Sequence, residues 1–242
     1  MKERILQALK QVLMLAAIAG MYVAVRTWGT FTLLHRIPFV AASFDPALVG
    51  ILESHLWQFL FALAGLTVLS RGNLWSCGIN SMNVRMSLGM LLRFYAGAVA
   101  VLVIIGLAGG FLRIAYSEFP PADRGLVMVI HWLSSPVADQ LLFFGLFQTA
   151  LLKVWTGRIR IGESEIPSAI FITAVMFALG RIGLPHYISN PLEYAAGYGI
   201  GLFSGYVYYR TRSLLAPMLA QAFFFGMPDA VHIIFSLLGY RL

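Results

Sequence analysis

Long apolar stretches with almost no charge recur along the whole chain, and they restrict its fold more than any other feature. A helix needs about 20 largely apolar residues to cross a bilayer. In lipid, backbone polar groups must bond internally, which leaves helical bundles or closed barrels. The stretches do not alternate as barrel strands would, so they predict an all-α transmembrane bundle. The expected spans are Leu6–Trp28, Val49–Leu69, Met86–Phe111, Leu126–Leu152, Pro167–Ile182, Leu192–Tyr209 and Ser213–Met227.

A shorter apolar run, Ala230–Leu238, either completes a further crossing or lies in the interface, so we expect a polytopic bundle of about seven or eight spans. The composition agrees, because 60% of the residues are hydrophobic and only 11% are charged. Soluble domains carry about 25% charged residues. With no linker or polar segment in the sequence, we interpret residues 1–242 as a single integral membrane domain.

The net charge of +7 is explained by basic loops. Lysines and arginines follow alternate predicted spans, which favours a multi-pass protein with a cytoplasmic N-terminus. We expect this membrane to be the inner or plasma membrane of a prokaryote. The bilayer is therefore the expected partner, and the absence of basic stretches with interleaved aromatics argues against nucleic acid. The single cysteine, Cys77, excludes an intrachain disulfide and a cysteine-based metal site. The chain begins with basic residues and an apolar run, as a signal peptide does. We interpret this segment as a first transmembrane span that is not removed.

Charged residues inside predicted spans are candidates for function, because burying a charge in lipid is costly unless it is paired. They are Glu53, Arg93, Asp139, Arg181 and Asp229. The alternative is that they form structural ion pairs or lie near the headgroups. Gly197, Gly201 and Gly205 recur every fourth residue, which predicts a helix face that packs closely against another helix.

Three segments in the second half of the chain carry a family resemblance. Asp139-Gln140-Leu-Leu-Phe-Phe144-Gly145 has the form of a Glu-Glu-Leu-Leu-Phe-Arg-Gly motif, and Phe177-Ala-Leu-Gly-Arg181 that of Phe-x-x-x-His. A glycine-rich stretch, a Tyr-Tyr-Arg turn and a final segment ending at Gln221 follow. In order and spacing, residues 134–225 resemble the CPBP family of intramembrane proteases, which includes the type II CAAX prenyl proteases.

The resemblance implies a water-activating glutamate, two histidines and an asparagine, with a divalent metal as the usual family cofactor. Most of these groups are replaced here. The two glutamate positions hold Asp139 and Gln140, and the arginine position holds Phe144. The histidine positions hold Arg181 and Gln221, and the asparagine position holds Phe225.

The replacements leave one acid and no ligating imidazole. Arginine stays protonated and offers no lone pair, so Arg181 can be neither base nor metal ligand. We therefore expect no metal and no cofactor, and we hypothesise that Asp139 and Arg181 form a buried ion pair in place of the catalytic centre. The leading interpretation is a catalytically inactive or impaired homologue that binds or regulates a membrane protein or peptide partner.

Two alternatives remain open. An active endopeptidase could use Asp139 as the water-activating acid, with His131 or His186 relocated to assist it. A small-solute transporter could use Glu53, Arg93 and Asp139, although no inverted repeat relates the two halves of the chain.

Overall fold

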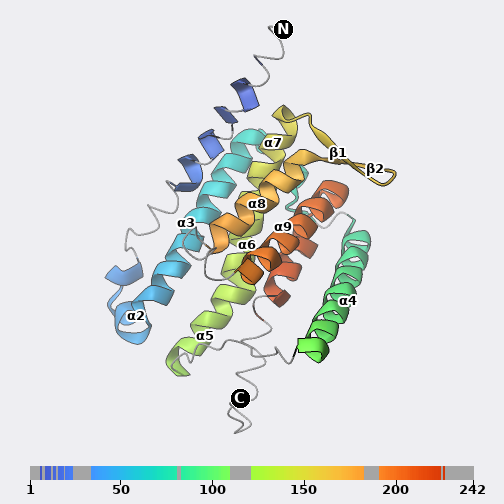
Figure 1. Cartoon of the computed structure of the whole chain (residues 1–242). Helices are drawn as coiled ribbons and strands as arrows, with labels where there is room; N and C mark the ends of the chain where they lie inside the picture. Colours follow the sequence, from blue (N-terminus) through green and yellow to red (C-terminus); the bar gives the residue numbers. More distant parts are fainter. Residues whose placement is uncertain are drawn as a thin grey trace.

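A computed structural model shows how the apolar stretches are arranged (Figure 1). It describes residues 6, 9–11, 13–14, 16–18, 20–23, 34–80, 83–109, 121–182, 191–224 and 226. Helices dominate, as the sequence predicts. The elements before the central helix are η1 (Leu34–Arg36), α2 (Pro38–Ser43), α3 (Pro46–Leu69), η2 (Leu74–Cys77) and α4 (Val84–Gly109). Helical residues also occur within Leu9–Val23.

The central helix passes through five consecutive segments without leaving the helical backbone. These are α5 (Pro121–Val129), the π-helix η3 (Ile130–Ser134), α6 (Ser135–Asp139), the π-helix η4 (Gln140–Gln148) and α7 (Thr149–Val154). In η3 the Ser135 N–H bonds to the Ile130 carbonyl five residues back. Pro136 follows at once and has no N–H to donate, so a wider turn at this point loses less hydrogen bonding.

A short hairpin departs from the all-helical expectation. Strand β1 (Arg158–Ile161) pairs antiparallel with β2 (Ser164–Pro167) immediately after α7. Beyond it come α8 (Ser168–Ile182), α9 (Pro191–Thr211) and a last described helix, Leu215–Phe224. The sequence analysis treated the hairpin segment only as a basic loop, because its four-residue strands are too short to give a clear alternating pattern.

Helix α3 begins and ends where local chemistry dictates. The Asp45 side chain accepts a 2.7 Å hydrogen bond from the Ala47 N–H, and Pro46 occupies the first turn, where its missing N–H costs nothing. At the other end the Gly72 N–H bonds to the Thr67 carbonyl with Gly72 at φ 86°, which is the left-handed conformation that favours glycine. The helix therefore starts three residues before the predicted Val49 and ends at the predicted Leu69.

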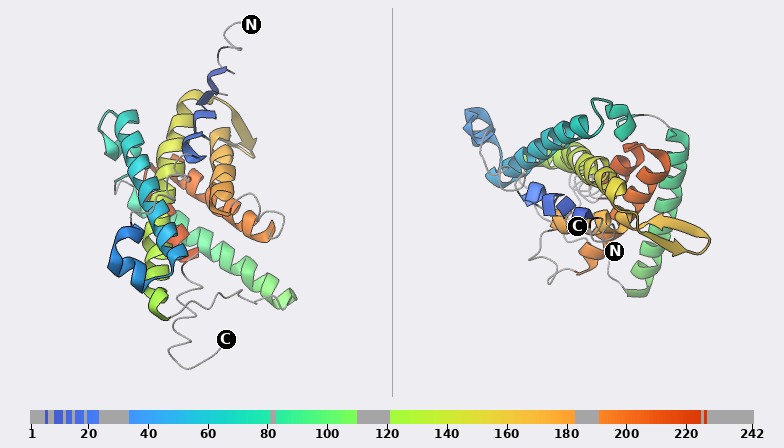
Figure 2. Two further views of the ribbon diagram at one scale, coloured as in Figure 1. Left: turned by 90° about the vertical axis from the view of Figure 1, so that its left-hand side faces the viewer. Right: turned by 90° about the horizontal axis from the view of Figure 1, so that it is seen from above.

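The core lies between the central helix and the helices packed around it. Helix α3 runs alongside the central helix, and α8 packs on α9 (Figures 1 and 2). Most of the large buried side chains come from the central helix, above all from η4, whose residues are all buried. The core also includes Leu66, Phe177, Tyr208 and Leu214 from surrounding segments.

Large apolar side chains also cover the outside of the bundle. On α3, only 28% of the most apolar window is buried inside the protein, and Leu56, Leu60 and Val68 are exposed. Leu92 on α4 and Leu133 on the central helix are exposed as well. Such a surface is costly in water and expected in lipid.

Two helices, Pro46–Leu69 and Gly125–Val154, are both long enough and apolar enough to cross a bilayer. Helices at 84–109, 168–182, 191–211 and 215–224 also overlap four of the predicted spans, Met86–Phe111, Pro167–Ile182, Leu192–Tyr209 and Ser213–Met227. The number of crossings stays a prediction. Residues 230–238 lie outside the described residues.

Candidate functional site

The acidic motif position is buried within the central helix. Asp139 is the last residue of α6 and is 5% exposed. Ser135 lies one turn earlier on the same face, and its Oγ donates a 3.0 Å hydrogen bond to Asp139 Oδ2. The carboxylate is thus already held by a neighbour within its own helix.

A second helix brings Gln221 to this carboxylate. Its Nε2 donates to Asp139 Oδ2 at 2.7 Å and to Ser135 Oγ at 3.1 Å, while its Oε1 accepts from Gln140 Nε2 at 2.7 Å. Gln140 and Gln221 are fully buried. We call Ser135, Asp139, Gln140 and Gln221 the amide–carboxylate network. Three of its members are predicted motif positions, and Gln221 is more than 80 residues from Asp139 and Gln140 in the chain.

The helix that carries Gln221 is held by contacts on either side of that residue. The Leu214 N–H bonds to the Gly78 carbonyl at 3.0 Å, and the Tyr95 hydroxyl donates to the Ala220 carbonyl. Trp132 Nε1 donates to the Gly226 carbonyl at 3.1 Å. These bonds tie the last described helix to η2, to α4 and to the central helix, which fixes the position of the amide group.

The charge of Asp139 determines how the Gln221 amide is turned. A carboxylate only accepts hydrogen bonds, so Gln221 directs its NH2 group toward Asp139 and its carbonyl oxygen toward Gln140. The lone pairs of Gln221 therefore point away from the acid. Gln140 Oε1 is buried without a hydrogen-bond partner among the described residues.

The side chains at this point do not suit a divalent metal ion. Such an ion needs several deprotonated or carbonyl ligands turned toward one centre. Asp139 instead faces N–H and O–H donors from Gln221 and Ser135. Within the described part of the chain, no three His, Cys, Asp or Glu side chains are grouped so that they could hold a metal.

Two other motif positions are occupied by packed aromatic rings. Phe144 and Phe177 are fully buried, with ring centroids 5.5 Å apart. Phe143 lies 5.6 Å from Phe177 in an edge-to-face arrangement and 5.7 Å from Tyr22. Where the resembled family has an arginine, this chain has a side chain that is part of the hydrophobic core.

The remaining motif positions are only partly described. Arg181 lies in α8, but its side chain is outside the described residues, and Phe225 is outside them entirely. The Asp139–Arg181 ion pair therefore stays a prediction. His186 and Asp229 also lie outside the described residues.

The glycine positions lie on α9 where it meets its neighbours. A Cβ atom on Gly201 would stand 3.0 Å from Ala174 Cα of α8, and one on Gly205 would stand 2.7 Å from Gln148 Oε1 of the central helix. The Gln148 side chain also donates from Nε2 to the Gly205 carbonyl at 2.9 Å. Gly197 is buried on the same helix.

The other charged candidates in the described residues lie on α3 and α4. Glu53 of α3 is 1% exposed, and nearby His55 Nδ1 is 3.1 Å from Ser134 Oγ. Arg93 is exposed on α4.

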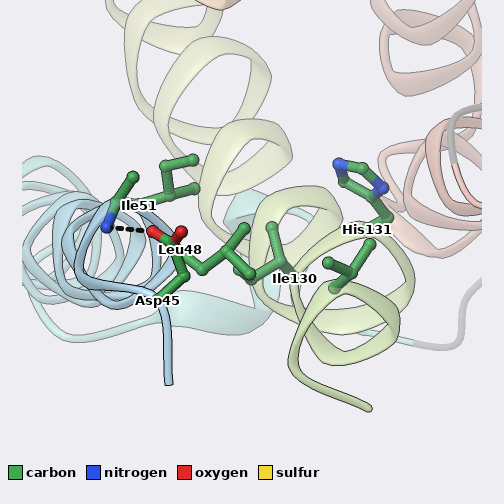
Figure 3. A pocket seen from close by; sticks show the side chains of 7 residues that line it. Asp45, Leu48, Ile51, Ile130 and His131 are labelled. Carbon is green, nitrogen blue, oxygen red and sulfur yellow. Dashed lines mark hydrogen bonds between the residues drawn. The ribbon is translucent and has the colours of Figure 1, made fainter. Parts of the chain in front are cut away.

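His131 faces a pocket of about 250 Å³ at the end of the bundle where α3 begins (Figure 3). The pocket lies between α3 and the α5–η3 segment, and its lining residues do not include Asp139. Its lining is mainly aliphatic, with Asp45 and His131 at its polar margins.

Ser135 is the network residue that sequence reasoning missed. Its signal was present, because a hydroxyl four residues before an acid on a helix can reach that acid. The Gln140–Gln221 bond carried no such local signal, since its partners are far apart in sequence.

Comparison with known proteins identifies the same region. Residues 121–227, which run from the start of α5 past the last described helix, match the family model described as Type II CAAX prenyl endopeptidase Rce1-like. No curated protein and no solved structure is significantly similar to the chain. Together with the two long apolar helices, the match describes a membrane protein. Over residues 121–227, the chain is therefore similar to the Rce1-like type II CAAX prenyl endopeptidases.

Proposed function

We propose that this protein is a non-proteolytic CAAX-protease-like membrane protein, which binds a membrane protein or a peptide without cleaving it. The observation that carries the proposal is the pair of hydrogen bonds from Gln221 Nε2 and Ser135 Oγ to Asp139 Oδ2. They engage the acid at the position from which the family resemblance would have it activate water.

Peptide hydrolysis needs a base that can take a proton from water and groups that stabilise the developing oxyanion. Asp139 is 5% exposed, and its Oδ2 already accepts hydrogen bonds from Gln221 Nε2 and Ser135 Oγ, which compete with a water molecule for the same oxygen. The neighbouring amides of Gln140 and Gln221 do not ionise, so they cannot relay a proton as histidine would. These features favour a site that has kept its scaffold and lost its proton chemistry.

The packing around the network supports the same proposal. At the motif's arginine position Phe144 places an apolar ring, which packs against Phe177. A charged group introduced there would be buried without a solvated partner, at high cost. The interior at this position is therefore filled by packed apolar side chains. A ligand would be bound through apolar contacts and hydrogen bonds.

We further propose a multi-pass arrangement of seven or eight spans with the N-terminus in the cytoplasm of a prokaryotic cell. Basic residues from several loops gather at one end of the bundle, which supports this topology. Gln11 Nε2 donates to the Val154 carbonyl, Lys153 Nζ donates to the Leu69 carbonyl, and Asn80 Nδ2 donates to the Arg212 carbonyl.

The test compares binding with cleavage for one ligand. The full chain is reconstituted in lipid nanodiscs with a fluorescent, prenylated peptide that ends in a CAAX sequence. Anisotropy measures binding, and mass spectrometry measures cleavage. We expect saturable binding with an intact peptide for both the wild type and Asp139→Asn.

Cleavage by the wild type that is lost in Asp139→Asn would show an active endopeptidase and overturn the proposal. Absence of binding would remove the prenylated peptide as the ligand. Capture from native membranes then compares the proteins retained by the two forms, and fragments held only by the wild type would again indicate catalysis.

A further inference from the structure

The β1–β2 hairpin presents two chemically different faces. Ile159 pairs with Ile166, and Ile161 pairs with Ser164, so these side chains share one face. Arg160 pairs with Glu165 and Arg158 with Pro167 on the opposite face. The hairpin therefore has an apolar side and a charged side, although each of its strands has only four residues.

The apolar side is not covered by the described part of the protein. Ile159 is 41% exposed and Ile161 is 53% exposed. Figures 1 and 2 show the hairpin projecting sideways from the helices, and from above its tip extends beyond α4. Two exposed isoleucines on a projecting hairpin lose free energy in water, and burial in an apolar phase would recover it.

The base of the hairpin is firmly attached to the bundle. Trp155 Nε1 donates to Ser168 Oγ at 2.8 Å, and this hydroxyl donates to the Gly157 carbonyl at 2.8 Å. The Ser168 N–H donates to the same carbonyl at 2.9 Å. Within the hairpin, by contrast, the Arg158–Glu165 ion pair is 3.8 Å long with both side chains more than half exposed, and it adds little stability.

The position of the hairpin indicates what its apolar side contacts. It follows Gly125–Val154, one of the two helices in the described residues that are long and apolar enough to cross a bilayer, and Trp155 stands at the junction. Tryptophan is enriched where membrane helices leave the hydrocarbon region. Lys153, Arg158 and Arg160 supply basic side chains at this level, which match the phosphate groups of lipids.

We propose that the hairpin lies flat in the interface of the bilayer. Ile159 and Ile161 enter the boundary between headgroups and acyl chains, and Arg158 and Arg160 contact lipid phosphates. The hairpin then fixes the depth and tilt of the central helix, which carries Asp139. This inference rests on the membrane part of the proposed function and not on the absence of proteolysis.

The test measures depth in the bilayer at three positions of the full chain. Cys77, the only cysteine, is replaced by alanine, and single cysteines are introduced by Ile161→Cys, Arg160→Cys or Leu60→Cys. Each is labelled with an environment-sensitive fluorophore in proteoliposomes of phosphatidylcholine and phosphatidylglycerol. Lipids with a nitroxide near the headgroup, or deep in the acyl chain, serve as quenchers.

We expect the label at position 161 to emit at shorter wavelength and to be quenched several-fold more by the shallow nitroxide than the label at 160. The label at 60, on the exposed side of α3, is expected to be quenched by the deep nitroxide. Equal, weak quenching at 160 and 161 together with strong quenching at 60 would overturn the hairpin proposal alone. Weak quenching at all three positions would overturn the membrane assignment together with it.

Discussion

The side-chain amide of Gln221 donates a 2.7 Å hydrogen bond to Asp139 Oδ2, which joins the last described helix to the centre of the bundle. The same amide accepts from Gln140 and donates to Ser135. Charge-assisted bonds of this kind are stronger than those between neutral groups. The two family positions are thus connected here by a structural contact between helices.

Removal of the Gln221 amide should destabilise the protein strongly. Gln221→Leu leaves a buried carboxylate with fewer donors, and we expect a loss of about 3 kcal/mol in the free energy of unfolding. Asp139→Leu should also destabilise. The double variant should lose less free energy of unfolding than the sum of the two single losses, because neither the carboxylate nor the amide is then left buried without the other. Denaturant titration in mixed micelles measures all three, and additive losses would contradict a direct interaction.

Two glycines of α9 should respond in opposite ways to the same change. Gly201→Ala places a methyl group 3.0 Å from the Ala174 backbone, and we expect a loss of about 1–3 kcal/mol through overpacking. Gly199→Ala, with no heavy atom within 4 Å of the new methyl group, is the matched control. It should be neutral or stabilise by up to about 1 kcal/mol, because alanine favours the helix. Similar effects at both positions would argue against close packing of α8 on α9.

The aromatic cluster should carry a large part of the stability. Phe177→Ala opens a cavity among buried rings, and we expect a loss of about 3–5 kcal/mol. Phe39→Ala removes a ring that is 72% exposed on α2 and should change the stability by less than about 0.5 kcal/mol. Thermal unfolding of both variants in the same detergent provides the comparison. A small loss for Phe177→Ala would show that the cluster is loosely packed.

Divalent metals should not stabilise this protein. A ligand that binds only the folded state raises the melting temperature according to its concentration relative to its Kd. Because Asp139 faces hydrogen-bond donors, we expect the same Tm in zinc chloride, in magnesium chloride and in chelator. A known zinc protein in the same detergent serves as positive control. A rise in Tm with zinc that Asp139→Asn abolishes would refute this prediction.

Much of the helical layout could be predicted from the chain alone. The predicted span Leu192–Tyr209 corresponds to α9, Pro191–Thr211, and Pro167–Ile182 corresponds to α8, Ser168–Ile182. Each stretch satisfies its own backbone hydrogen bonds, so its composition is enough to indicate a helix. The hairpin at 158–167 was missed because its two strands depend on pairing with each other.

The site was predictable only in part. The spacing of the motif identified Asp139, Gln140 and Gln221, which the structure brings together, and the absence of acid–base and metal chemistry that we expect from their residue types stays a prediction. The sequence suggested Arg181 as the partner of the acid. The structure shows Ser135 and Gln221 as partners of the acid, through bonds of 3.0 and 2.7 Å, and the contact with Arg181 stays a prediction.

The sequence by itself determined the helical character of the chain and the likeness of residues 134–225 to CAAX proteases, with other residue types at most positions of the family's motif, since apolar length, charge and residue identity are local properties. Only the tertiary structure decided that Gln221 binds Asp139, that Phe144 packs on Phe177, and that the hairpin projects from the bundle. Each of these depends on segments distant in the chain being held at one place by packing, and side-chain hydrogen bonds then form between whichever groups that packing brings together.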